Sequence, residues 1–316
     1  MRGRFRVAKL PAGDCGVKDQ VSRLGIPNEK YLQKLQIFFL VAIDYLYICA
    51  YNKTYKQGGV AMKKFLVWTG IVAMLAVGLV GCGGEKPAAT QKVLRVGTSA
   101  DFSPFEFMDE KGKMTGFDVE LMEALAKQMN RKLDHQNISF DGLIPAVQSG
   151  NIDAAISAIS MTPDRAKAIL FSEPYYQSGL VVVVKDGNTE IKSMADLKGK
   201  KIAVQIGTTG ANKANKIAGA TVREFNLSPD TFLELKNGNV DAVVNDLPVV
   251  QVFLKEQKNS GVKVVGEPEE SENYGIVMSQ KNPDLAKELN TALAELKKNG
   301  EYGKIYEKWF GKPVSK

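Results

Sequence analysis

From residue 93 onward, short apolar runs alternate with stretches whose apolar residues recur at helical spacing. Residues 93–97 and 201–205 are apolar runs of strand length, whereas residues 118–129 carry their apolar side chains on one face of a helix. The same pattern, together with the Thr-Pro pair that opens 162–168, predicts further elements. These are strands at 154–159, 180–184 and 241–244, and helices at 141–149, at 162–168, from about 211, at 282–300 and at 302–310.

This alternation of strands and helices predicts the fold class. Strands separated by helices of such length indicate an α/β fold with a mostly parallel sheet. A chain of 316 residues fits two αβ lobes better than one domain. No internal repeat or low-complexity tract changes this expectation.

Residues 62–81 have the features of a secretory signal. Lys63 and Lys64 form a basic start, an apolar run follows, and small residues lead into Cys82. The ending Leu-Val-Gly-Cys matches the lipobox pattern, which predicts a diacylglycerol lipid on the Cys82 sulfur and cleavage before that residue. The alternative is a transmembrane helix, but the apolar run is short for a span of roughly 20 residues. Residues 82–91, rich in Gly, Pro, Ala and Thr, are expected to form a flexible tether.

Residues 1–61 stand in front of this signal, although export signals act from the N-terminus of a chain. Gln57, Gly58 and Gly59 can be encoded by CAA GGA GGT, which is also a strong ribosome-binding site shortly before Met62. We therefore expect translation to begin at Met62 and 1–61 to be an over-extended gene reading. The alternative is a membrane segment at 37–51, which is short and carries a central aspartate.

The charge distribution argues against a nucleic-acid ligand. The formal net charge of the whole chain is +7, but the excess of Lys and Arg lies before residue 82. Residues 82–316 hold 30 basic and 31 acidic side chains and show no basic stripe that could follow a phosphate backbone. We expect no nucleic-acid partner.

The cysteine and histidine content limits the chemistry. No cysteine follows Cys82, and His135 is the single histidine, which excludes a disulfide or thiolate zinc site after residue 82 and a histidine-rich metal site anywhere. A Ser-His-Asp or Cys-His mechanism would depend on that one histidine. We expect no metal, no organic cofactor and no enzymatic activity.

Three features suit a ligand with one positive and one negative end. Arg165 follows a predicted strand and provides a planar, permanently charged fork for a carboxylate. The amides of Thr208 and Thr209, at a strand-to-helix junction, could bind the same carboxylate. Asp246 follows another strand, where ligands of open α/β sheets bind, and could pair with an ammonium. A buried amino acid needs partners for both of its charges.

Each feature also has an ordinary structural interpretation. Arg165 could be a solvated surface charge, the threonine turn a helix cap, and Asp246 a strand-end cap. Phe102 and Phe140 lie at strand-to-loop positions, where they could sandwich the aliphatic stem of a ligand or belong to the core. The residues alone leave these alternatives open.

Eight stretches, in a fixed order over residues 93–310, resemble those of one known family. They are PFEF from Pro104, GFDVEL from Gly116, FDGLIPAVQSGNIDAAI from Phe140, TPDRAKAILFSEPYY from Thr162, DLKGKKIAVQIGTTG from Asp196, GNVDAVVND from Gly238, YGI from Tyr274 and EYGKIYEKWFG from Glu301. With them the chain resembles the family-3 solute-binding proteins of polar amino-acid ABC importers. The resemblance implies a type II periplasmic-binding-protein fold, with lobe one at 92–177 and 275–316, lobe two at 180–272, and two crossing strands near 175–179 and 273–275.

The resemblance also implies the groups that hold the ligand backbone. Arg165 would bind the α-carboxylate, helped by Ser160 and by the amides of Thr208 and Thr209. Asp246 would bind the α-ammonium.

Five more residues complete the implied site. The carbonyl of Ala158 would also accept from the ammonium, Phe102 and Phe140 would be the stacking pair, and Ser99 and Gln205 would face the ligand side chain.

The sequence departs from some relatives around the ligand side chain. Several carry an aspartate where this chain has Ser99. Either Asp101 takes the place of that aspartate, or the pocket lacks its charge. The glutamine-binding pattern has a lysine where Gln205 stands. The expected ligand is therefore a polar or basic amino acid, with glutamine, arginine, lysine and histidine open.

The function that the resemblance implies is capture of a free amino acid by lobe closure, for delivery to an ABC permease and its ATPase subunits. We expect a monomer held on the outer face of the cytoplasmic membrane by the lipid on Cys82. Two alternatives are a sensing module for a receptor and an enzyme on the same scaffold that resembles cyclohexadienyl dehydratase.

Overall fold

The computed structural model describes residues 91–257, 259–269 and 271–311. The expected upstream extension 1–61, the signal 62–81, Cys82 and nearly all of the tether 82–91 lie outside these residues. The described residues belong to one unit, Ala89–Lys316. None of the helices among them is both long and apolar enough to span a membrane.

Lobe one is built on a five-stranded sheet in the order β5-β1-β6-β14-β7. A small antiparallel sheet in the order β2-β3-β4 adjoins it. The strands are β1 (Val93–Thr98), β5 (Lys132–Asn137), β6 (Ala154–Ala155), β7 (Leu170–Phe171), β14 (Val277–Met278), β2 (Asp101–Phe102), β3 (Glu106–Met108) and β4 (Met114–Thr115). The helices are α4 (Phe117–Gln128), α5 (Phe140–Ser149), α6 (Pro163–Ala166), α10 (Pro283–Lys298) and α11 (Glu301–Phe310).

The helices of lobe one form because each has an apolar face to bury and a defined start. Most residues of α4 are buried, including Leu121, Met122 and Leu125, and they pack against α10 and α11 in one apolar cluster. The helix α10 begins after Asn282, whose side chain accepts a hydrogen bond from the Leu285 amide. This packing joins the three helices to strand β1 of the sheet in a single core.

Lobe two is built on a second sheet in the order β10-β9-β11-β8-β12. Its central strands are apolar and buried, with helices over both faces, and the two faces belong to two separate apolar clusters. The strands are β8 (Tyr176–Lys185), β9 (Lys201–Gln205), β10 (Thr221–Phe225), β11 (Ala242–Asp246) and β12 (Val262–Val265). The helices are the 3-10 turn η1 (Met194–Leu197), α7 (Thr209–Ala214), α8 (Ser228–Asn237) and α9 (Leu247–Glu256).

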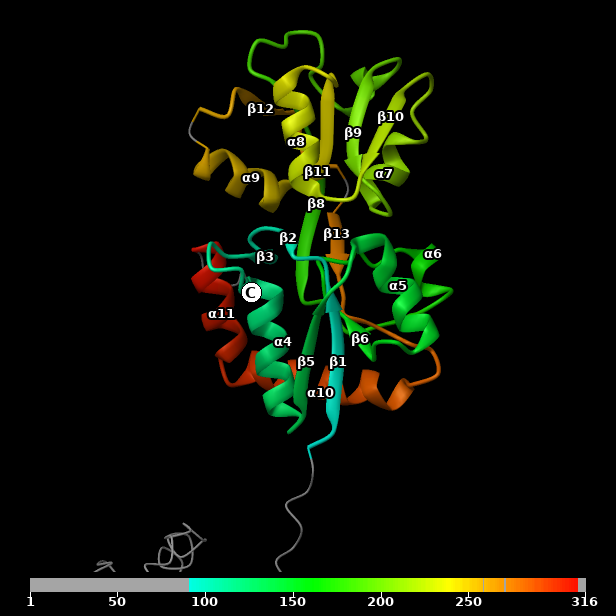
Figure 1. The fold of residues 1–316 in the computed structure, drawn as a ribbon, viewed down its shortest axis with the longest axis vertical. Coiled ribbons are helices and arrows are strands. Elements are labelled where there is room, and N and C mark those ends of the chain that lie inside the picture. Colours follow the sequence, from blue (N-terminus) through cyan, green and yellow to red (C-terminus); the bar gives the residue numbers. More distant parts are fainter. Residues whose placement is uncertain (1–90, 258, 270, 312–316) are drawn as a thin grey trace, which may run out of the picture. The chain divides into compact units, whose positions relative to one another are not determined.

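Two paired strands connect the lobes. Strand β13 (Ser271–Tyr274) runs antiparallel to the first half of β8, with Tyr274 opposite Tyr176 and Ser271 opposite Gly179. Figure 1 shows β8 and β13 side by side as they pass from one lobe to the other. The α/β two-lobed fold class is thereby confirmed.

Each sheet is mixed rather than mostly parallel. In lobe one, β1 pairs in parallel with β5 and β6, but β14 is antiparallel to β6 and β7. In lobe two, β9 pairs in parallel with β10 and β11, but β8 is antiparallel to β11 and β12. The antiparallel pairs arise where the chain has crossed from the other lobe, because β8 and β14 then enter their sheets in the reverse direction.

The predicted strand over 154–159 is much shorter in the structure. It ends at Ala155, and Ala158 adopts a left-handed conformation with φ 46°. This conformation is uncommon for a residue with a β-carbon, and it is supported by a hydrogen bond from the Ala158 amide to Asp118 Oδ2 of 2.8 Å. The sheet therefore gives way to a bent segment where the chain approaches lobe two.

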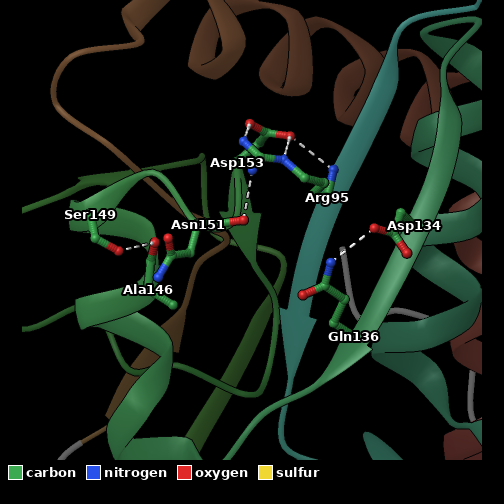
Figure 2. A network of polar contacts seen from close by, with 7 residues as sticks. All are labelled: Arg95, Asp134, Gln136, Ala146, Ser149, Asn151 and Asp153. Atoms are coloured by element: carbon green, nitrogen blue, oxygen red, sulfur yellow. Dashed lines mark hydrogen bonds and ion pairs between the residues drawn. The ribbon is translucent and has the colours of Figure 1, made fainter.

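An ion-paired arginine anchors the opposite end of β1. Figure 2 shows the Arg95 guanidinium against the Asp153 carboxylate, with Nη2 and Oδ1 2.7 Å apart, and Arg95 Nη1 2.8 Å from the Asn151 carbonyl. The Arg95 amide also donates to Asp153 Oδ2. This cluster ties the start of β6 to β1 and so fixes the strand that leads toward Ala158.

Candidate functional site

A small hollow with about 10 Å³ of free space lies between the lobes and is lined by both of them. Nine of the ten predicted ligand-binding residues line it, and Asp101 and Glu106 line it as well. Lobe one provides Asp101, Phe102, Glu106, Phe140, Ala158, Ser160 and Arg165, and lobe two provides Gln205, Thr208, Thr209 and Asp246.

Arg165 is held by both lobes. Thr162 caps the short helix α6 by accepting from the Arg165 amide, and the guanidinium donates from Nη1 to the Ser160 carbonyl at 2.8 Å. Its Nη2 donates to the Gly207 carbonyl of lobe two at 2.9 Å. The guanidinium lies 5.6 Å from the ring centre of Phe140. Burial lowers the pKa of Arg165 from its usual value, which marks a desolvated cation.

Asp246, the last residue of β11, is the buried acid of lobe two. Its Oδ1 accepts from the Tyr274 hydroxyl at 2.6 Å and from the Ser178 hydroxyl at 3.2 Å. Burial raises the pKa of Asp246 to about 6, although the Tyr274 hydrogen bond opposes the shift. No described lysine or arginine forms a salt bridge with this carboxylate, so it is available to a cation that enters the hollow.

Asp101 connects the hollow to both lobes. It accepts from the Ser99 hydroxyl at 2.9 Å within lobe one, and its Oδ2 accepts from Gln205 Nε2 at 2.9 Å and from the Ser228 amide at 2.7 Å in lobe two. Burial raises the pKa of Asp101. Ser99 is the one predicted residue that does not line the hollow, because its side chain is buried behind Asp101.

The two threonines form the strand-to-helix turn that the sequence predicts. Thr208 caps α7 by accepting from the Ala211 amide and donates its hydroxyl to the Gln205 carbonyl. The Thr209 hydroxyl donates to Glu272 Oε2 at 2.8 Å. Gly207 precedes them with φ 77°, which turns its carbonyl toward Arg165.

Glu106 is a lining residue that the sequence analysis missed. It is fully buried on β3, and its Oε1 accepts from the Ser157 hydroxyl at 2.8 Å. Desolvation and the neighbouring Asp118 hold the pKa of Glu106 well above its usual range. The available signal was an acid enclosed by Phe105 and Phe107, since a charged residue in an apolar run needs an explanation.

The charges of the lining form two groups. Arg165 interacts electrostatically with Asp246 and Glu272, whereas Glu106 interacts with Asp101 and Asp118. The lining thus combines a guanidinium from lobe one and a carboxylate from lobe two with two further acids, Asp101 and Glu106. Within the described residues, no cluster of three or more His, Cys, Asp or Glu side chains could hold a metal ion.

Sequence comparison shows which known proteins this chain is similar to. The profile of the bacterial extracellular solute-binding proteins, family 3, matches residues 94–312. A probable histidine-binding protein of Neisseria gonorrhoeae is 37% identical over 262 residues, covering 79% of this chain and 97% of that protein.

Solved structures show the same similarity. An ancestral arginine-binding protein, solved with arginine and with glutamine, is 48% identical with a TM-score of 0.68, covering 70% of this chain and 99% of its own. An ancestral amino acid-binding protein described as a precursor of cyclohexadienyl dehydratase is 40% identical with a TM-score of 0.64, covering 69% of this chain and 95% of its own.

Proposed function

Because this chain belongs to the bacterial extracellular solute-binding proteins of family 3, we propose that it captures a polar or basic L-amino acid between its lobes and delivers it to an ABC importer. The proposal depends mainly on one observation. Arg165 of lobe one and Asp246 of lobe two line the same hollow. A zwitterion is the small ligand that neutralises both.

We propose that Arg165 binds the α-carboxylate. A guanidinium has five N–H donors, and among the described residues two atoms of this one donate, to Ser160 and Gly207. The two carbonyls hold the guanidinium in place before the ligand arrives, so that little side-chain entropy is lost when its remaining donors bind a carboxylate.

We propose that Asp246 and the carbonyl of Ala158 bind the α-ammonium. Asp246 is desolvated and held by two hydroxyl donors, and the left-handed backbone of Ala158 brings that residue to the lining. Phe102 and Phe140 would enclose the aliphatic stem, and Gln205 would meet polar atoms further along it.

The acids Asp101 and Glu106 favour basic ligands over neutral ones. The ligand's own carboxylate and ammonium would offset Arg165 and Asp246, which leaves the fully buried Glu106 and the half-buried Asp101 as acids for the ligand side chain. A terminal ammonium or guanidinium would be attracted there more strongly than an uncharged amide, because both partners are desolvated.

Three hydrogen bonds support a mechanism of lobe closure. Arg165 reaches Gly207, and Asp101 reaches Gln205 and Ser228, each across the cleft. In the proposed cycle the ligand docks on one lobe, closure completes its contacts, and the permease recognises the closed form. The ligand can shift this equilibrium by no more than its extra affinity for the closed state.

The cellular setting remains part of the proposal. Lipid attachment at Cys82, a location on the outer face of the cytoplasmic membrane and a monomeric state rest on the sequence alone. A role in transport rather than sensing would be tested by amino-acid uptake in cells with and without the gene. Absence of dehydratase activity would be tested with prephenate and arogenate.

A thermal-shift screen tests the proposed function. The purified protein is heated with each of the twenty amino acids, ornithine and citrulline, and a ligand raises the unfolding midpoint by mass action. We expect arginine, lysine, histidine or glutamine to give the largest shift, and Arg165→Ala to abolish it. No shift with any of these compounds would contradict the proposal.

A further inference from the structure

Two carboxyl groups meet beside the hollow, Glu106 on β3 and Asp118 on α4. Both side chains are fully buried. Glu106 Oε1 accepts from the Ser157 hydroxyl, and Asp118 Oδ2 accepts from the Tyr175 hydroxyl at 2.7 Å and from the Ala158 amide at 2.8 Å. Glu106 Oε2 and Asp118 Oδ1 are buried without a hydrogen-bond partner among the described residues. The two residues are neighbours, because the Asp118 amide donates to the Phe105 carbonyl at 2.8 Å and the consecutive residues Ser157 and Ala158 each donate to one of the two carboxyls.

Such a pair keeps one proton, because two ionised carboxylates close together and out of water repel strongly. Asp118 ionises more readily than Glu106, because two donors bind its Oδ2. These hydrogen bonds oppose the effect of burial, which raises the pKa of Asp118 to about 6. Burial and the charge of Asp118 raise the pKa of Glu106 well above its usual range. At neutral pH, Glu106 is therefore the carboxylic acid and Asp118 the carboxylate.

The described residues around the pair add another acid and three hydroxyl groups. Asp101 on β2 is the further carboxylate that acts on Glu106. The phenol of Tyr175, just before β8, donates to Asp118, the phenol of Tyr302 on α11 interacts with Asp118 electrostatically, and Ser157 contributes a hydroxyl. The pair lacks a described salt-bridge partner, while Glu106 itself lines the hollow. A cationic ligand side chain in the hollow would therefore bring a positive charge to the pair.

We propose that the Glu106–Asp118 pair is a proton-coupled charge selector, which keeps its proton when the hollow is empty or holds a neutral side chain and releases it when a cationic side chain enters. The step breaks the O–H bond of the Glu106 carboxyl, leaves the electron pair on Oε2 and passes the proton to a buffer base. The ligand cation then takes the place of that proton beside two carboxylates. The inference rests on the proposed function and deepens it.

The selector explains how one hollow can accept two classes of side chain. A neutral amide meets a protonated Glu106, which can donate to the amide oxygen. A guanidinium or ammonium meets an ionised Glu106, which can only accept from it. Affinity for the cationic ligand should rise with pH, by up to about tenfold per pH unit below the pKa of Glu106, whereas affinity for a neutral ligand should not.

Isothermal titration calorimetry in two buffers of equal pH and different ionisation enthalpy measures the protons released. The probes are L-arginine, L-lysine and L-glutamine, and the proteins are wild type, Glu106→Gln and Asp164→Asn. Glutamine at 106 mimics the protonated acid, since its amide can donate to Asp118 while its oxygen accepts from Ser157. Asp164→Asn is the control, because it removes an exposed acid that pairs with Lys167 and does not line the hollow.

Wild type should release close to one proton per arginine or lysine bound at neutral pH, and none with glutamine. Glu106→Gln should release none and should lose at least about tenfold in arginine affinity relative to glutamine. Asp164→Asn should still release the proton. Arginine binding without proton release, or unchanged release from Glu106→Gln, would overturn the inference.

Two outcomes separate the inference from the proposed function. If glutamine binds and neither basic amino acid does, an amino-acid-binding protein remains but the charge selector is wrong. If none of the probes and none of the other amino acids binds, the proposed function itself fails. Should Glu106→Gln not fold, the comparison of arginine with glutamine on wild type still decides the matter.

Discussion

Replacing Asp246 with asparagine should make the ligand-free protein more stable while it abolishes binding. Asp246 is buried, and its contacts in the described structure are the hydroxyls of Tyr274 and Ser178. An asparagine oxygen can accept the same two hydrogen bonds without a charge. The substitution therefore removes a desolvated anion whose pKa stays raised despite the charge of Arg165.

The pKa of Asp246 sets the size of the effect. A rise in its pKa from the ordinary 3.8 to about 6 means that ionisation of Asp246 at neutral pH destabilises the folded protein. Each pKa unit corresponds to about 1.4 kcal/mol, so that the upper limit is about 3 kcal/mol. Because the introduced amide group must also be desolvated, we expect a gain of about 1–3 kcal/mol in the free energy of unfolding.

The pH dependence has a defined sign. The folded-state pKa of Asp246 lies above the unfolded value, so the folded protein binds this proton more tightly than the unfolded chain does. The contribution of Asp246 to stability is fully present below pH 3.8 and is lost as the pH rises through about 6. The asparagine variant cannot ionise at this position and so does not lose this stability. The difference in free energy of unfolding between the variant and wild type should therefore grow across that pH range and then level off.

Chemical denaturation of wild type and Asp246→Asn, at several pH values between about 4 and 7, tests this prediction. Asp164→Asn is the control, since Asp164 is an exposed acid paired with Lys167 whose removal should give no gain. A variant that is less stable than wild type at neutral pH, or an advantage that does not change with pH, would refute the reasoning.

Three further substitutions probe the cleft. Arg165→Ala should weaken amino-acid binding by about 3–5 kcal/mol in calorimetry, because the ligand carboxylate would be buried without a partner; an unchanged dissociation constant would remove Arg165 from the site. Asp101→Ala should open the lobes and enlarge the radius of gyration in small-angle scattering with ligand at a fixed concentration, since it removes both hydrogen bonds to lobe two; identical scattering would argue against this role. Gly207→Ala should cost about 1–2 kcal/mol of unfolding free energy for its φ of 77° and should also lower affinity, because the new β-carbon would lie 3.3 Å from Asp141 across the cleft; unchanged affinity would show that the lobes close without this approach.

Local sequence signals predict the elements that carry the ligand-facing residues. The Thr-Pro pair before Arg165 does cap α6, and Thr208 does cap α7, because such caps depend on a few neighbouring residues. Asp246 ends β11 as its apolar run suggests. These positions follow from short-range chemistry, and so a single sequence is enough to predict them.

The features that the sequence did not predict depend on distant contacts. The strand after Ala154 stops early because Asp118, many residues away, binds the Ala158 amide. Strand β5, which contains His135, was not predicted, because this polar edge strand has no apolar alternation to identify it. The proton-sharing pair of Glu106 and Asp118 exists only after β3 and α4 have packed together.

The account depends on one cleft that holds both charged ends of an amino acid, and one titration tests this most directly. The amino acid with the largest thermal shift and its α-carboxamide are titrated into wild-type protein by calorimetry. The account predicts that the amino acid binds at least about a hundredfold more tightly, because the amide leaves the buried guanidinium of Arg165 without an anion. Equal affinities for the acid and the amide would contradict it.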